Sequence, residues 1–239
     1  MEEDAFRTPA GTPVTAVTAG EMREVDRVAT EEVGLGLLQM MENAGRNLAA
    51  AVRTTGPDEV LVLAGAGGNG GGGLACARHL ANRSVDVEVA LDRTPGALDG
   101  AAAAQHRVVE AAGVPVREGI DGRPGADVVV DAVIGYGLTG AARGMARDLI
   151  EACAATDARV VSLDVPSGLD ATTGEAPGPA VDPDGVLTLA LPKTGLREVD
   201  APVTLADVAV PRTVYDRLGI PYEPPFAGEY RLSLDRNGE

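Results

Sequence analysis

The sequence has very few lysines and aromatic residues, and it has no long apolar run. Its 239 residues include no Trp, aromatic residues make up 3% of the chain, and the single lysine is Lys193. No apolar stretch approaches the roughly 18 residues that a membrane-spanning helix needs. The acidic N-terminus is also unlike a secretory signal, which begins basic and then turns apolar. These absences predict a cytoplasmic protein with no membrane partner.

Charge and composition exclude further classes. The formal net charge is −16, so the surface would repel a phosphate backbone, and we expect no nucleic-acid partner. Hydrophobic residues make up 45% of the chain, enough to form a full core. Cys76 and Cys153 are far apart, and neither has a second Cys or His at metal-ligand spacing. They are interpreted as two buried free thiols.

Short apolar runs alternate with helical segments along the chain. Strands are predicted at 59–64, 85–91, 127–131, 159–164 and 186–191, with another at 203–210. One helix is predicted to start at Thr18, which begins a capping-box pattern with Glu21. Further helices are predicted at 37–52, 70–80, 98–112 and 141–155. This alternation indicates βαβ units. The fold class is therefore predicted as α/β, a three-layer αβα sandwich around a mainly parallel sheet.

The two ends of the chain look different from the middle. Prolines and small or charged residues at 1–14 predict a flexible lead-in, and prolines after position 220 with a polar finish predict a loose tail at 223–239. No repeat or linker divides 15–222, which we interpret as one domain.

The richest loop in glycine follows the first predicted strand. Gly65, Gly67 and Gly70 satisfy a dinucleotide-binding fingerprint, and Asp92 ends the next strand at the distance expected for a ribose contact. Such glycines let amide N–H groups approach a phosphate, but they also serve close packing of a helix on a sheet. No Gly-Lys-Ser/Thr follows, which excludes a P-loop nucleotidase.

Polar residues follow the other strands. Asp131 precedes a loop with three glycines. In the next loop, Pro166 and Gly168 form a sharp turn that presents Asp164 and Ser167. A last loop carries Lys193. The carboxyl ends of parallel strands share one edge of a sheet, so these loops should converge there with Asn69. Amide, hydroxyl and single carboxylate oxygens suit a monovalent cation, or they hydrogen-bond to one another.

Four motifs in order, after Met-Glu-Asn-Ala-Gly at 41–45, carry a resemblance. They read GxGxNGGxGL, DAxxGxG, DxPSGLD and KxGL. Over about residues 18–210 the chain resembles the NAD(P)H-hydrate epimerase family, the N-terminal domain of the YjeF type. In animals the same domain occurs as an apolipoprotein A-I-binding protein.

The resemblance implies a Rossmann-like domain that interconverts the R and S epimers of hydrated NADH and NADPH. It implies a functional partnership with an S-specific dehydratase and, by analogy, a homodimer. It also implies potassium as cofactor, bound by Asn69, Asp131 and Ser167. The positions that match the nucleotide site are Gly67, Gly68, Asn69, Gly70, Gly71, Gly72, Gly135, Tyr136, Gly137, Leu138, Thr139, Gly140, Ala141 and Asp164. For catalysis we interpret Asp164 as the general acid and base, with Lys193 beside it or neutralising a phosphate.

The glycine loop departs from the family pattern at two positions. Where the family has Asn-Asn-Gly-Gly-Asp, this chain has Gly68, Asn69, Gly70, Gly71 and Gly72, so an acidic side chain is missing. One alternative is therefore that this chain is a non-catalytic member of the family, which binds the nucleotide without turning it over. An NAD-dependent oxidoreductase is the other. It has less support, because position 189, four residues before Lys193, is Leu and not Tyr.

Overall fold

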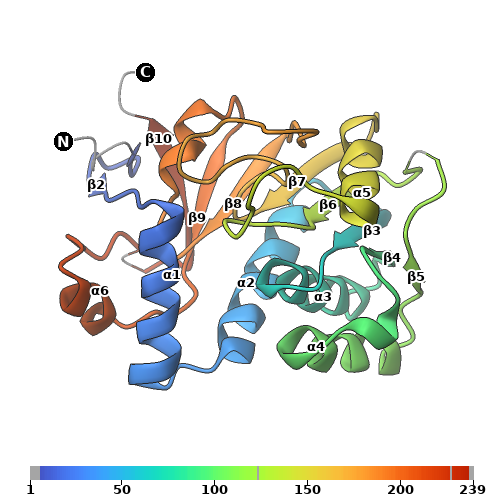
Figure 1. Cartoon of the computed structure of the whole chain (residues 1–239), viewed down its shortest axis with the longest axis horizontal. Helices are drawn as coiled ribbons and strands as arrows, with labels where there is room; N and C mark the ends of the chain where they lie inside the picture. The colour runs from blue at the N-terminus through green and yellow to red at the C-terminus, as the bar shows by residue number, and fades with distance from the viewer. Residues whose placement is uncertain (1–5, 123, 227, 237–239) are drawn as a thin grey trace.

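The computed structural model describes residues 6–122, 124–226 and 228–236, and these build one long sheet flanked by helices (Figure 1). Its strands are β1 (Phe6–Arg7), β2 (Pro13–Val14), β3 (Glu59–Ala64), β4 (Asp86–Leu91), β5 (Val116–Glu118), β6 (Val128–Ala132), β7 (Arg159–Leu163), β8 (Gly185–Leu189), β9 (Val203–Ala206) and β10 (Arg231–Arg236). Their order across the sheet is β2-β1-β10-β9-β8-β7-β6-β3-β4-β5.

Strands β3 to β9 all run parallel to one another. Antiparallel pairing occurs only at the edge formed by β10, β1 and β2. The chain runs outward from β3 through β4 to β5, then returns to β6 on the other side of β3 and continues through β7 and β8 to β9. The order therefore reverses between β3 and β6. In such sheets a crevice opens at that point, outside the carboxyl ends of the strands.

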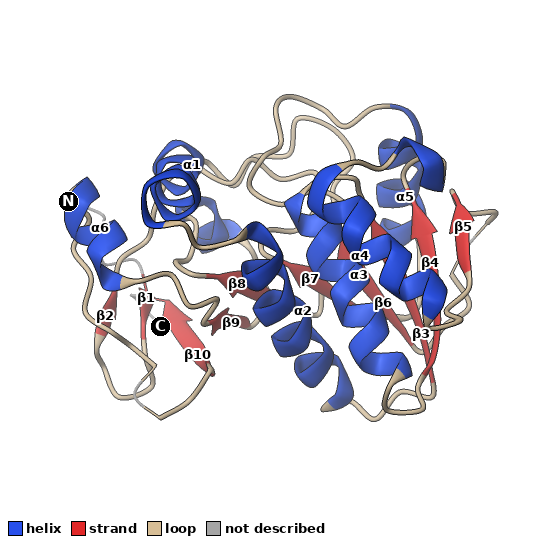
Figure 2. Cartoon of the chain, turned by 90° about the horizontal axis from the view of Figure 1, so that it is seen from below, coloured by secondary structure: helices blue, strands red, loops and turns tan. Residues whose placement is uncertain are grey.

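Helices cover both faces and confirm the predicted three-layer, Rossmann-like arrangement (Figure 2). One face carries α2 (Leu37–Arg53), α3 (Gly68–Ala81) and α4 (Gly100–Ala111), and the other carries α5 (Gly144–Ala154). Successive side chains of a strand point to opposite faces. Accordingly Val60 and Val62 of β3 pack in the core cluster with α2, α3 and α4, while Leu61 and Leu63 pack with α5.

Helix α1 (Ala19–Arg27) lies beside α6 (Arg212–Leu218) at the β8–β9 half of the molecule. Thr18 caps this helix as predicted. The Thr18 hydroxyl accepts a hydrogen bond from the Glu21 amide, and the Glu21 carboxylate accepts one from the Thr18 amide. A π-helical turn (Val28–Val33) follows directly. The apolar face of α1, with Met22 and Val25, packs in the same cluster as the side chains of α6.

Two predictions about the chain ends are wrong where the structure describes them. Residues 6–14 are not a loose lead-in, because β1 and β2 pair as a hairpin at the sheet edge. In the expected tail, 231–236 forms β10 between β1 and β9. The reason is burial: Phe6 and Leu234 lie in one core cluster, and Arg236 donates to the Ala201 carbonyl at 2.6 Å. Residues 1–5, 227 and 237–239 lie outside the described residues.

Glycines let α3 approach the sheet. A Cβ on Gly70 would lie 1.7 Å from the Gly65 carbonyl oxygen, and one on Gly73 would lie 2.6 Å from the Ala132 Cβ. A side chain at either position would therefore push α3 away from β3 and β6. For these positions, close packing explains the glycine.

The cysteines are as expected from the sequence. Cys76 and Cys153 are free and buried, and burial raises the pKa of both thiols. Among the described residues, no helix has the length and apolarity needed to cross a bilayer.

Candidate active site

A cavity of about 600 Å³ opens at the carboxyl ends of the central strands, where the strand order reverses. That volume lies within the range of small-molecule sites. Eight of the residues predicted for the site line it: Gly67, Gly68, Asn69, Gly135, Tyr136, Gly137, Asp164 and Lys193. The loops after β3, β6, β7 and β8 therefore converge at one rim, as the parallel sheet predicted.

Asp164 and Lys193 form a buried ion pair in this cavity. Asp164 is 3% exposed and Lys193 is 1% exposed. Oδ1 of Asp164 accepts a close hydrogen bond from Lys193 Nζ and another from the Leu189 amide at 3.2 Å. Oδ2 accepts from the Tyr136 amide at 3.4 Å. The carboxylate, itself on the loop after β7, is thus held by the end of β8 with its following loop and by the loop after β6.

The backbone at Asp164 is bent sharply to present this side chain. Asp164 has φ +69°, and the amide of Val165 donates across it to the Leu163 carbonyl at 2.9 Å. This is the γ-turn geometry, which is rare and strained. Ala190 repeats it after β8, with φ +61° and a 2.7 Å bond from Leu191 to Leu189. Strain of about 1–3 kcal/mol at a residue persists only where the surroundings enforce it.

Lys193 is held from several sides. Its Nζ also donates to the carbonyls of Leu189 at 2.9 Å and Leu191 at 3.0 Å. Its backbone is joined to the segment before α1 by an isolated bridge to Val17. The ammonium therefore has no freedom to leave Asp164, which suits a positioning role.

Asp131 and Ser167 do not line the cavity; they contact each other beside residues 133–134, which do, and both are fully buried. The Ser167 hydroxyl donates a close hydrogen bond to one Asp131 oxygen, and the Ser167 amide donates to the other at 2.8 Å. Ser162 and the Val133 amide complete the set of donors. These donors lower the pKa of Asp131, but burial outweighs them and raises it overall. Every group that donates to this buried carboxylate here is neutral.

Asn69 lies against the neighbouring loop. A Cβ on Gly135 would lie 3.0 Å from Asn69 Oδ1 and 3.2 Å from Asp164 Oδ2. The preceding residue, Ile134, donates its amide to the Ser167 hydroxyl at 2.8 Å. The dipeptide 134–135 thus contacts both Asn69 and Ser167. Asn69 Nδ2 is buried and has no hydrogen-bond partner among the described residues.

Other predicted site residues do not line the cavity. Gly70, Gly71 and Gly72 are buried: Gly70 packs against the Gly65 backbone, Gly71 against α2, and a Cβ on Gly72 would lie 2.8 Å from Leu163 Cδ2. In the loop after β6, Leu138, Thr139, Gly140 and Ala141 continue past the rim. The sequence could not separate glycines that face a ligand from glycines that face a packed neighbour.

The sequence also missed one whole wall of the cavity. Met22, Arg23 and Asp26 of α1 line it, together with Met40 and Met41 of α2. The hydroxyl of Tyr136 donates a close hydrogen bond to Asp26 Oδ2. Met41 belongs to the motif that precedes the glycine loop, a usable signal. Asp26 offered none, because it looks like any acid on the polar side of a surface helix.

Breaking the Asp164–Lys193 pair should destabilise the fold. Replacing Lys193 with Met leaves an unpaired buried carboxylate, which typically costs about 3–5 kcal/mol of unfolding free energy. Urea unfolding measures this. The matched control is Arg147→Met, which breaks an exposed pair with Glu151 at 2.8 Å and should cost less than about 1 kcal/mol. Equal costs for the two variants would contradict the buried ion pair.

Comparison with known proteins identifies the family of this chain. The family described as YjeF-related protein N-terminus matches residues 37–195. A protein of Dehalogenimonas lykanthroporepellens named NAD(P)H-hydrate epimerase is 44% identical over 237 residues, 96% of each chain. A protein of the same name from Rhodopirellula baltica is 34% identical over 213 residues, covering 87% of this chain and 85% of its own.

Longer relatives and a solved structure also match. A bifunctional NAD(P)H-hydrate repair enzyme of Methanopyrus kandleri is 38% identical over 194 residues, which are 77% of this chain and 39% of that enzyme. The crystal structure of yeast ynu0 has the same fold, with a TM-score of 0.79 at 24% identity, over 92% of this chain and 100% of that one. The chain therefore belongs to the YjeF-related N-terminal family.

Proposed function

We propose that this protein is an isomerase that interconverts the R and S epimers of hydrated NADH and NADPH. The observation that carries the proposal is the cavity itself, where an open helix N-terminus and the Asp164–Lys193 ion pair lie together. The two relatives named NAD(P)H-hydrate epimerase, which match nearly the full chain, support the same reaction. An S-specific dehydratase is the functional partner that consumes the product.

The nucleotide phosphates fit at the start of α3. Gly67 and Gly68 line the cavity, and a Cβ on either would meet nothing within 4 Å. The backbone there is open to a ligand, and a helix N-terminus favours an anion. Arg23 and Arg143 also line the cavity and offer positive charge to an anionic substrate, whereas Arg93 there is paired with Asp92.

The reaction requires the hydroxyl on carbon six of the reduced ring to leave and to return on the other face. The C6–O bond breaks as the oxygen is protonated, and the lone pair of ring nitrogen N1 forms a double bond to C6. Water then adds to C6 and returns a proton. Asp164 is the first candidate for this proton transfer, and Lys193 positions it. A positioned carboxyl group is typically worth about 10²–10⁴ in rate.

The missing acid of the glycine loop need not abolish turnover. Position 72 points at Leu163 and α2, not into the cavity, so in this chain a carboxylate there would have no access to the ring. This favours the enzyme over the alternative of a binding protein without turnover. In the oxidoreductase alternative Asp92 binds the ribose, but Arg93 Nε pairs with its carboxylate at 3.0 Å.

Potassium fits the residues around Asp131. A buried carboxylate whose hydrogen-bond donors are all neutral leaves room for one positive charge, and the Asn69 Oδ1 oxygen lies beside Gly135 of the neighbouring loop. Asn69, Asp131 and Ser167 would hold the ion. When bound, it would neutralise Asp131 and add positive potential near the nucleotide. No cluster of three or more His, Cys, Asp or Glu side chains suited to a metal occurs among the described residues, consistent with a monovalent ion.

The reaction is tested with R-hydrated NADH, an S-specific dehydratase and high potassium. The protein should accelerate recovery of NADH absorbance, and Asp164→Asn should slow this by about 10²–10⁴-fold in kcat, because the proton carrier is gone. The control Asp182→Asn, exposed in the loop after β7, should keep the wild-type rate. If the wild-type protein did not accelerate the recovery of NADH absorbance, the proposed function would be refuted. If a folded Asp164→Asn variant kept the wild-type rate, only the assignment of Asp164 would be refuted.

Potassium binding is tested by thermal unfolding in potassium, sodium or choline chloride at equal ionic strength. Potassium at about 100 times its dissociation constant should add about 2.7 kcal/mol, several degrees in Tm. Asn69→Ala should lose this shift yet match the wild type in choline, because Nδ2 has no described protein partner. The same Tm in all three salts would refute the site.

A further inference from the structure

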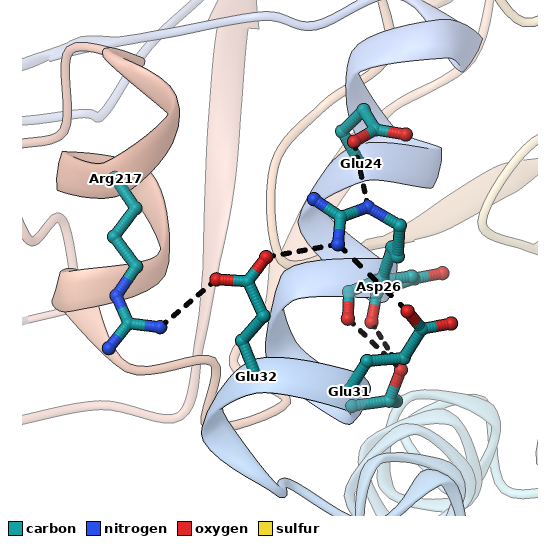
Figure 3. Close-up of polar contacts among 7 residues, drawn as sticks. Glu24, Asp26, Glu31, Glu32 and Arg217 are labelled. Carbon is teal, nitrogen blue, oxygen red and sulfur yellow. Dashed lines mark hydrogen bonds and ion pairs between the residues drawn. The ribbon is translucent and has the colours of Figure 1, made fainter.

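A second carboxyl group faces the same cavity from a different element. Asp26 lies on α1 and lines the cavity, where the Tyr136 hydroxyl donates to its Oδ2. Exposed ion pairs lie along the same helix and the turn after it: Arg27 contacts Glu24 and Glu32, each at 2.9 Å, and Glu32 contacts Arg217 of α6 at 3.2 Å (Figure 3). Packing of Met22 and Val25 against α6 fixes the helix with Asp26 toward the cavity.

The backbone at Asp26 is fixed as well. The π-helical turn begins two residues later, at Val28, and the Thr30 hydroxyl donates to the Asp26 carbonyl at 2.8 Å (Figure 3). Such π turns occur frequently at functional sites. Among the described residues the Asp26 side chain forms no ion pair: it accepts a hydrogen bond from the Tyr136 hydroxyl, and Lys193 acts on it only through its charge.

Asp26 and Asp164 have contrasting surroundings. Burial raises the pKa of Asp26, and the charge of Asp164 raises it further, while the Tyr136 hydrogen bond and the charge of Lys193 act against this. Asp164 is instead held directly by an ammonium group. Two carboxyl groups in one cavity with different environments are a recurrent arrangement for acid–base work.

Epimerisation places a demand that one carboxyl group meets poorly. The departing hydroxyl and the returning water occupy opposite faces of the ring, so proton transfer is needed on both. Resting on the function proposed above, we propose that Asp26 is the second acid–base group: Asp164 exchanges a proton with the oxygen on one face, and Asp26 with the oxygen on the other. Tyr136 positions Asp26 through its hydroxyl.

The steps balance without any oxidant or reductant. In one direction Asp26 donates a proton to the hydroxyl, water leaves with the C6–O electron pair, and the N1 lone pair forms the N1=C6 bond. Water then attacks C6 from the other face, the N1=C6 electrons return to N1, and the Asp164 carboxylate accepts the proton. In the reverse direction the two carboxyl groups exchange roles.

Exchange of oxygen with ¹⁸O-labelled water separates the two faces. Each purified epimer is incubated in labelled water with enzyme or with a blank, and label and inversion are measured by chromatography with mass spectrometry. Wild-type protein should label and invert both. Asp26→Asn should lower inversion about 10²-fold or more, yet one epimer should still gain label, through Asp164. In the Asp164→Asn variant the other epimer should still gain label, through Asp26.

Controls make the result specific. Glu24→Gln removes a carboxylate from the same helix on its exposed side and should change neither rate. Tyr136→Phe keeps the ring and should shift the ratio of labelling to inversion in the direction of Asp26→Asn, but less. Wild-type rates in Asp26→Asn, or an equal loss of labelling in both epimers, would overturn the proposal. A wild-type protein that neither labels nor inverts would refute the proposed function itself.

Discussion

The buried pair of Asp164 and Lys193 is the interaction on which the site depends. Two charges in a dry interior are tolerated only when each has its partner and further hydrogen bonds. The Lys193 ammonium meets this condition by joining the carboxylate to the carbonyls of Leu189 and Leu191, and the Tyr136 amide binds the second carboxylate oxygen. The loops after β6, β7 and β8 are thereby drawn to one point.

The parallel sheet makes this convergence possible. Because the strand order reverses between β3 and β6, their loops diverge and leave a cavity outside the strand ends. Close packing of α3, allowed by Gly70 and Gly73, brings the open helix N-terminus beside that cavity. The open helix N-terminus and the Asp164–Lys193 pair thus line the same cavity, as the proposed substrate with its phosphates and reactive ring would require.

The sequence predicts the sheet and the residues at the ends of its central strands, since those runs are buried on both faces and end in recognisable motifs. It identified Asp131 and Ser167 as neighbours, and they touch. It failed where the signal is tertiary. Asp26 reads as a solvent-facing acid until α1 packs, and β10 has only Leu232 and Leu234 to mark it. Gly72 is indistinguishable from Gly68 by sequence, although one is packed and the other open.

The central claim is that the reacting ring lies in this cavity beside Asp164. A crystal structure with the tetrahydronicotinamide analogue of the substrate, which lacks the hydroxyl on carbon six, tests it most directly. The account predicts the phosphates at the N-terminus of α3 and carbon six within hydrogen-bonding reach, through one water, of the Asp164 carboxylate. A nucleotide bound outside the cavity, or with its reduced ring turned away from Asp164, would contradict it.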